Sequence, residues 1–243
     1  SSNQEWFLAL AERQPDWVEA VWRSLCESSL RSKKEIRIPH IGLLRHEATL
    51  RPMALGLLPR ILLKWPSKVS ESNFPEFVQV LDIVLAQCAP DEVSRLVAER
   101  LKRKSLGTLQ TGYLLMAGLW VDHSTFAPLL QSLLNKRQIE QTELLGFISH
   151  LNRYGGSPEP LPAWDAPTLG MLFRIFGPLC SASTPAGVHW IGKEDEGRAF
   201  LHQLLAALRN DTSETAQQEL QRLLTEPALS HWKHLLEETV SRQ

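Results

Sequence analysis

The sequence of 243 residues predicts an all-α fold in which about thirteen helices stack into a solenoid. Apolar residues recur at helical spacing along most of the chain, and segments with the alternation typical of β-strands are nearly absent. From residue 74 onward the expected helices come in pairs, about 30 residues apart. A helix pair cannot bury both of its faces alone, so stacking on the next pair would give a core that runs lengthwise.

The first helices are clearly amphipathic. In PDWVEAVWRSL, within the helix expected over 16–29, five apolar residues are expected to share one face: Trp17, Val18, Val21, Trp22 and Leu25. The full set of expected helices spans 4–13, 16–29, 40–48, 51–64, 74–88, 90–104, 107–119, 122–134, 138–154, 166–178, 194–209, 212–225 and 228–241.

Local signals support several of these boundaries. Pro90 suits a first helical turn, and Asp91 and Glu92 would lie at the positive end of that helix. In DTSETAQQELQRLL, Asp211 and Glu214 have the spacing of a capping box. The segments EIRIPH and VHWI are short and lack an alternating partner nearby, so no strand is expected there.

Two segments interrupt the helical pattern. Residues 153–167 contain four prolines and two glycines, and residues 177–192 form a second long loop. The expected organisation is therefore a helical array over 1–154, a Pro/Gly-rich loop or bend over 155–167, and repeats over 168–243 that continue the same array.

The charge balance argues against general attraction to polyanions. The chain carries 26 basic and 27 acidic residues, a net charge of −1, so neither nucleic acid nor an anionic membrane is an expected partner. The run LKRK, with Lys102 to Lys104, falls where a helix should end. Cations there favour the negative end of the helix dipole, which is the simpler explanation of the run.

Cysteine usage and hydropathy indicate a cytoplasmic location. Cys26, Cys88 and Cys180 are far apart and lie in apolar stretches, as expected of reduced, mostly buried thiols. There is no signal-peptide pattern, and the longest apolar run, Met53 to Leu63, is too short to cross a bilayer. The chain begins without methionine and enters a helical pattern almost at once, which suggests a piece of a longer protein.

The segment GVHWIGK, Gly187 to Lys193, satisfies most of a P-loop pattern. A working P-loop follows a buried strand, has small residues and places Ser or Thr after the lysine. Here Glu194 follows Lys193, the interior residues are bulky, and the upstream sequence CSASTPA is no strand. Nucleotide binding is therefore not expected, and Gly192 is expected to end a loop before a new helix whose first turn is acidic.

Other candidates for chemistry are weak. His231 and His234 could share a metal on one helix, with Glu237 as the nearest third ligand, but solvated helix histidines are commoner. Cys180 and His189 could form a nucleophile and base without a nameable oxyanion hole, and Ser181 and Ser183 lack a nucleophile-elbow context. No catalytic, cofactor-binding or metal-ligating residue is assigned.

Two groups of residues could mark a binding surface. The polar run with Arg45, His46, Glu47 and Arg51 could bind a partner, although the outer face of a helix is the favoured interpretation. The chain has eight tryptophans: Trp6, Trp17, Trp22, Trp65, Trp120, Trp164, Trp190 and Trp232. Exposed tryptophans would mark an interface, but filling gaps between stacked helices is the favoured role.

Two segments resemble a known class of protein. Residues 108–134 (TLQTGYLLMAGLWVDHSTFAPLLQSLL) and 194–243 are similar to the helical-repeat region that follows the NACHT ATPase in bacterial anti-phage defence proteins of the STAND class. The matching elements of the second segment include LLAAL, the DTSETA junction and the leucines and tryptophan of LLTEPALSHW. MLFRIFGPL, before it, is also similar.

The resemblance implies a right-handed, HEAT-like array without catalysis of its own. In that class a nucleotide-binding module hydrolyses ATP, and the helical array senses a trigger or holds the protein shut. The chain contains none of the family's catalytic motifs, so the resemblance implies a sensor or scaffold region that binds a protein or other macromolecular trigger. A free-standing helical adaptor and, less favoured, a nucleic-acid-binding repeat protein remain as alternatives, and the partner-binding residues are unassigned.

Overall fold

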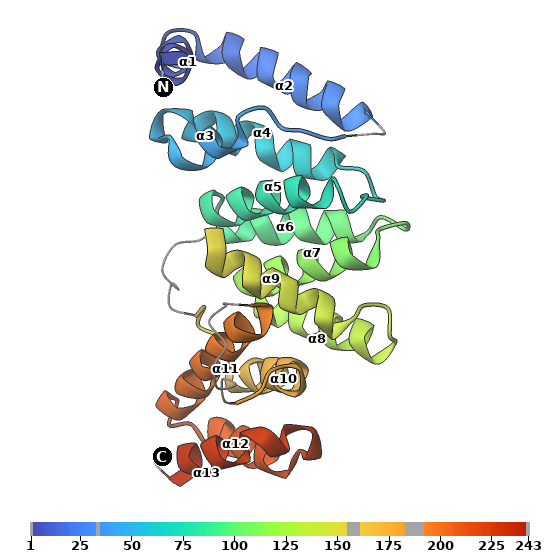
Figure 1. Cartoon of the computed structure of the whole chain (residues 1–243), viewed down its shortest axis with the longest axis vertical. Coiled ribbons are helices and arrows are strands. Elements are labelled where there is room, and N and C mark those ends of the chain that lie inside the picture. The colour runs from blue at the N-terminus through green and yellow to red at the C-terminus, as the bar shows by residue number, and fades with distance from the viewer. Residues whose placement is uncertain (1, 33–34, 155–160, 183–191, 242–243) are drawn as a thin grey trace. The chain divides into compact units, whose positions relative to one another are not determined.

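The computed structural model describes residues 2–32, 35–154, 161–182 and 192–241, and within them every regular element is a helix (Figure 1). The all-α prediction is therefore confirmed for these residues. The α-helices are α1 (Ser2–Arg13), α2 (Pro15–Arg31), α3 (Ile41–His46), α4 (Arg51–Lys64), α5 (Phe74–Gln87), α6 (Pro90–Leu101), α7 (Thr108–Val121), α8 (His123–Asn135), α9 (Gln141–Tyr154), α10 (Ala166–Phe176), α11 (Lys193–Asn210), α12 (Glu214–Thr225) and α13 (Lys233–Ser241). Three 3₁₀ turns, η1 (Ala48–Leu50), η2 (Gly177–Leu179) and η3 (Pro227–Trp232), complete the described elements.

Two segments that were each expected to form one helix consist of an α-helix and a 3₁₀ turn. The segment expected over 40–48 consists of α3 followed by η1, and the segment expected over 228–241 consists of η3 followed by α13. In η3 the backbone departs from helical geometry at Leu229, with φ −105° and ψ 16°. The apolar pattern does not reveal this kink, because Leu229 at the kink and Trp232 after it are both buried.

The predicted capping box at the start of α12 is wrong. Ser213 is the N-cap residue, and its hydroxyl accepts a hydrogen bond from the backbone N–H of Ala216 at 3.2 Å. The carboxylate of Asp211 instead accepts from the backbone N–H of Ser213 at 2.9 Å. The predicted N-cap, Asp211, lies two residues before the actual one, Ser213, because aspartate and serine both serve as N-caps.

The chain divides into two compact units, Ser1–Asp122 and His123–Gln243. In the first unit α4 packs against α2, α5 and α6, and α6 packs against α7. The centre of this core includes Leu57, Trp65 and Phe77, none of which is exposed. The rings of Trp65 and Phe77 meet edge to face, with centroids 5.8 Å apart, a favoured arrangement for buried aromatic pairs.

Polar contacts hold the irregular segments of this unit. The buried side chain of Asn73 accepts a hydrogen bond from the backbone N–H of Ile36 at 2.8 Å. Arg45 forms an ion pair with the buried carboxylate of Asp82 on α5, with N and O atoms 2.5 Å apart. Burial raises the pKa of Asp82, and the Arg45 guanidinium partly offsets this effect.

In the second unit α11 packs against α9, α10, α12 and α13. Helices on both sides of the segment 155–167 therefore belong to one compact unit, although residues 155–160 lie outside the described part of the chain. A bend there, and the continuation of one array through 168–243, stay predictions.

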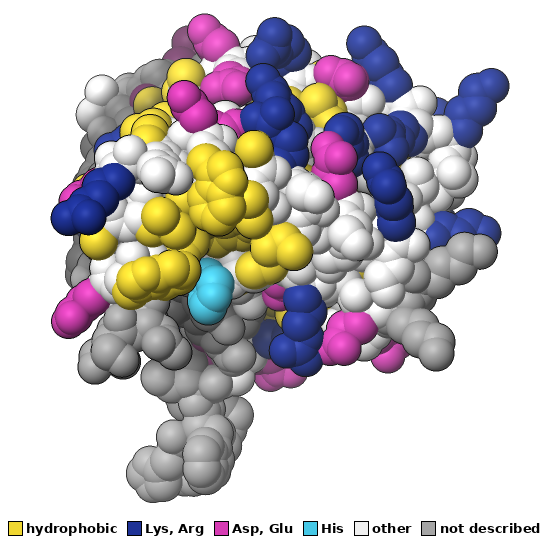
Figure 2. All heavy atoms as spheres, turned by 90° about the horizontal axis from the view of Figure 1, so that it is seen from above, with side chains coloured by type: hydrophobic (Ala, Val, Ile, Leu, Met, Phe, Trp, Pro, Cys, Tyr) yellow, Lys and Arg dark blue, Asp and Glu magenta, His cyan; other side chains and the backbone are white. Residues whose placement is uncertain are grey.

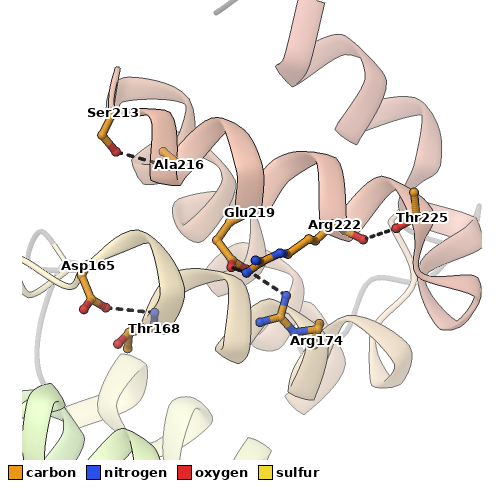
Figure 3. A network of polar contacts seen from close by, with 8 residues as sticks. All are labelled: Asp165, Thr168, Arg174, Ser213, Ala216, Glu219, Arg222 and Thr225. Atoms are coloured by element: carbon orange, nitrogen blue, oxygen red, sulfur yellow. Dashed lines mark hydrogen bonds and ion pairs between the residues drawn. The ribbon is translucent and has the colours of Figure 1, made fainter.

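A buried carboxylate links α10 to α12 in the second unit (Figure 3). Glu219 on α12 is 2% exposed and forms ion pairs with Arg222 on the same helix and with Arg174 on α10, the latter at 3.0 Å. Gly170 makes this approach possible, because a Cβ atom there would lie 2.4 Å from the Glu219 carboxylate.

Candidate binding surfaces

Helix α2 carries two apolar stripes rather than one. Val18, Trp22 and Cys26 are buried, as predicted for the first two. Trp17, Val21 and Leu25 follow each other at intervals of four residues and are 55%, 39% and 52% exposed, so their predicted place on a single buried face is wrong. The two stripes are adjacent on the helical wheel, which is why one sequence pattern contains both.

On α1, Trp6 is 67% exposed. We call Trp6, Trp17, Val21 and Leu25 the apolar face. Figure 2, seen from above the view of Figure 1 and so from the side of α1 and α2, shows hydrophobic side chains gathered on this surface. Apolar side chains gathered in this way are typical of an interaction site, whereas single exposed ones are ordinary.

Charged residues flank the apolar face unevenly. Glu12, Arg13 and Asp16, near the junction of α1 and α2, are exposed and together carry a charge of −1, while Arg31 ends α2 and is exposed and basic. The exposed positions of α2 between Trp17 and Leu25 are Ala20, Val21 and Ser24, none of them charged. The face is thus apolar along its length, acidic at one end and basic at the other.

The tryptophans divide between core and surface. Trp22, Trp65, Trp164 and Trp232 are buried, as the favoured interpretation predicted. Trp120 is half-buried, and Trp190 lies outside the described residues. Trp6 and Trp17 contradict that interpretation, and no sequence signal separated them from the others, because exposure depends on whether another helix covers the position.

The P-loop lookalike begins a helix. Gly192 is the N-cap residue of α11, as predicted, and its N–H donates to the carboxylate of Asp195 at 2.9 Å. This hydrogen bond is the main cause of the lowered pKa of Asp195. Glu194, Asp195 and Glu196 occupy the first turn of α11, so carboxylates stand where a phosphate would need open N–H groups. Residues 187–191 lie outside the described part of the chain.

Cys180 is a buried residue that packs against α11. Its thiol is 1% exposed, and burial is the main cause that raises its pKa to about 11. Its sulfur packs close to Gly197 of α11, where a Cβ atom would lie 2.6 Å from it. A thiol with this pKa is protonated at neutral pH and is a poor nucleophile. Its possible base His189, and Ser183, are outside the described residues, and the backbone O of Ser181 accepts a hydrogen bond from Arg198.

The histidine pair is split between two elements. His231 belongs to η3 and His234 to α13, so their predicted place on one helix is wrong. Nε2 of His231 lies 2.9 Å from the carbonyl oxygen of Gly177 and 3.0 Å from that of Cys180, and the indole N–H of Trp232 donates to the same two oxygens. Glu237 lies 3.9 Å from Lys233 as an ion pair. Within the described residues no group of three or more His, Cys, Asp and Glu could hold a metal ion.

The polar run that begins at the end of α3 is partly buried. Arg45 has only 14% of its side chain exposed and pairs with Asp82, so it does not lie on an outer face. His46 and Arg51 are exposed, and Glu47 is half-buried. The amide of Gln87 donates to the carbonyl oxygens of Leu44 and Arg45, which fixes the end of α3 against α5.

Two depressions lie on the second unit. A wide one of about 670 Å³ is lined by Glu214, Gln217, Gln218, Gln221, Arg222 and Val240. A narrower one of about 200 Å³ lies between α11 and α13 and contains His202, Arg209 and Glu238. Burial, with a smaller effect of Arg198, lowers the pKa of His202. Glutamine amides are the commonest groups in the first lining, whereas the second combines His202, Arg209 and Glu238 with leucine and alanine side chains.

Among the described residues, no helix combines the length and the apolar character needed to cross a bilayer.

No protein-family model, curated protein or solved structure matches the chain significantly.

Proposed function

We propose that this chain is a non-catalytic recognition and scaffolding region of a larger prokaryotic defence protein of the NACHT or STAND class, and that it binds a protein partner. The leucine and tryptophan patterns of residues 108–134 and 194–243 support the assignment to this class. The proposal includes a right-handed, HEAT-like stacking of helices, which successive packing of α2, α4 and α6 in the first unit supports.

The binding proposal rests on the exposure of Trp6 and Trp17 on the apolar face. Tryptophan is enriched among residues that dominate binding energy, since it buries a large apolar area. Apolar side chains gathered on one exposed helix face are typical of an interaction site.

The occupant that fits this face is an amphipathic helix of a protein partner. A helix lying along Trp17, Val21 and Leu25 would present its own apolar stripe at the same four-residue spacing. Running antiparallel to α2, it would place cations of its last turn beside Glu12 and Asp16 and carboxylates of its first turn beside Arg31. These are the charges that each helix end favours.

Site-specific photo-crosslinking tests the proposal. A photoreactive residue at position 17 should crosslink, in cells, to a defined segment of one protein, and a synthetic peptide of that segment should then bind the purified chain. Trp17→Glu should weaken peptide binding by about thirtyfold or more, since interface tryptophans are worth about 2 kcal/mol or more. Leu129→Glu, at an isolated exposed leucine of α8, should leave it unchanged.

Crosslinks to a second copy of the chain or to lipid alone would refute a protein helix as the occupant. Equal loss of binding in both variants would show that the effect is not specific to the apolar face.

The complete coding sequence tests the assignment to the defence class. A P-loop and an acidic strand encoded upstream of Ser1 would support it. A start codon beside Ser1, without an ATPase elsewhere in the product, would contradict it and favour the free-standing adaptor.

A further inference from the structure

Three basic segments of the first unit lie at one edge. They contain the ends of α2, α4 and α6 or the residues that follow, and Figure 1 shows these helices running to the same side of the unit. We define the basic edge as Arg31, Arg37, Lys64, Lys68, Lys102, Arg103 and Lys104, all of which are exposed. In Figure 2, Lys and Arg side chains gather at that side. Only the run 102–104 was noticeable in the sequence.

Hydrogen bonds and an ion pair connect the three segments. Lys64 pairs with Glu27 of α2 at 2.5 Å, and Arg103 donates to the carbonyl oxygen of Leu63. The N–H of Gly107 donates to the carbonyl oxygen of Ser67 at 3.1 Å. The basic edge is thus a continuous surface built from residues up to about 70 positions apart.

The positive charge of this edge is only partly neutralised. Against its seven cations stand, among the described residues, the carboxylates of Glu27, Glu35, Glu71 and Glu76, the last of which also raises the pKa of Arg37. Glu27 and Glu35 already pair with Lys64 and Arg37. The side chains of the remaining lysines have no hydrogen-bond or ion-pair partner among the described residues: Lys68, Lys102 and Lys104. The surplus is local, because the whole chain has a net charge of −1.

Stabilisation of helix ends does not account for all of these cations. At the end of α4, the carbonyl oxygens of Leu63 and Pro66 are occupied by the guanidinium groups of Arg103 and Arg100. Arg100 is fully buried, and burial together with nearby Arg103 lowers its pKa to about 10. It remains charged at neutral pH and adds to the positive potential beneath the edge. Lys68 is therefore not needed to complete the end of α4.

The chemistry of the edge fits a phosphate backbone. The exposed residues of its described segments, 31–32, 35–37, 64–72 and 102–105, are all Lys, Arg, Glu or Ser. Lysine, arginine and serine are typical phosphate contacts. Single-stranded nucleic acid would call for aromatic rings on which bases stack, and these segments expose none.

From these observations we infer that the basic edge binds the phosphate backbone of duplex nucleic acid without reading its sequence. The inference goes beyond the proposed function and does not depend on it: the two proposed sites share only Arg31, and the variants that test the basic edge leave Arg31 unchanged.

Fluorescence anisotropy with a labelled DNA duplex of about 20 base pairs tests the inference. The wild-type chain should bind at about 50 mM salt, and its affinity should fall steeply as salt rises. The triple variant Lys68→Gln, Lys102→Gln, Lys104→Gln should bind at least about tenfold more weakly at that salt. Its salt slope should be smaller by about 2.7, since each phosphate contact contributes about 0.9.

A charge-matched control is the triple variant Arg13→Gln, Arg51→Gln, Arg60→Gln, which removes three exposed cations outside the edge. It should keep wild-type affinity and slope, and Trp17→Glu should also keep duplex binding. The inference is overturned if the control loses as much affinity as the edge variant or if the wild type does not bind at low salt. It is also overturned if phosphatidylserine vesicles or polyglutamate compete as well as unlabelled duplex does.

Discussion

At the scale of single residues, Gly197 shows how closely the helices of the second unit approach. A Cβ atom there would lie 2.6 Å from the sulfur of Cys180 and 2.6 Å from a methyl carbon of Leu145. Both neighbours are buried, so neither can move into solvent. Glycine at this position of α11 therefore serves close packing rather than an unusual backbone angle.

Gly197→Ala should destabilise the protein. Overpacking costs about 1–3 kcal/mol, and the better helix propensity of alanine returns at most about 1 kcal/mol. Urea denaturation should show a net loss of about 1–2 kcal/mol. Gly42→Ala in α3 is the matched control, since a Cβ atom there meets nothing within 4 Å, and it should be neutral or stabilising. Equal effects at both positions would contradict this view of the packing.

Cys26 couples stability to alkaline pH. Burial, with Glu76 and Glu27 nearby, raises its pKa to about 12 from an ordinary value of 9.0. A raised pKa in the folded state means that the neutral thiol stabilises the fold fully below pH 9.0. That contribution is lost as the pH rises toward about 12.

The unfolding free energy of the wild type minus that of Cys26→Ala should therefore decrease from about pH 9 upward, by up to about 1.4 kcal/mol per pH unit. Urea titrations of both proteins at several pH values measure this difference. A difference that stays constant to pH 11, or that grows, would show that Cys26 is not shielded in the folded state.

At the scale of elements, α2 has one apolar side that is buried in the core and another that is exposed. Trp22 is 3% exposed and contacts the ring of Phe7 edge to face at 5.2 Å, whereas Trp17 is 55% exposed. The two tryptophans differ by five positions, which places one toward α1 and α4 and the other toward solvent.

Trp22→Ala and Trp17→Ala should therefore have opposite consequences. The first should lower the unfolding free energy by about 3–5 kcal/mol, since it empties a core position. The second should change it by less than about 0.5 kcal/mol, yet weaken the binding of a helical partner. Thermal and urea denaturation give the stabilities. A large loss of stability for Trp17→Ala would mean that the apolar face is part of the fold rather than a binding surface.

At the scale of the whole molecule, the division after Asp122 gives each half its own core. Side chains such as Leu57 and Phe77 fill the first unit, and Phe173, Leu204 and Trp232 fill the second, all fully buried. Each unit also has its own polar links, Arg45 to Asp82 in the first and Arg174 to Glu219 in the second.

The fragments 1–122 and 123–243 should each fold when expressed alone. Domains of about 100–150 residues ordinarily bury enough surface to be stable. Each fragment should give a helical circular dichroism spectrum and a cooperative thermal transition. A fragment that unfolds without a transition would show that its unit depends on the other half of the chain.

The sequence by itself determined the helices. Apolar spacing predicted nearly all of them to within a few residues, because helix formation responds to local signals such as Pro90, the acidic first turn of α11 and the stripe of Val93, Leu96 and Val97. Errors arose where two local signals competed, as with Asp211 and Ser213, or where a kink left the apolar spacing intact, as at Leu229.

Tertiary structure alone decided which surfaces are open. Trp17 and Trp22 look alike in the sequence, and only the neighbours of α2 determine that one is covered and the other exposed. Lys68 and Lys104 are distant in sequence, and only the common direction of α4 and α6 brings them to one edge. Burial and surface charge depend on contacts between distant residues, which no local pattern specifies.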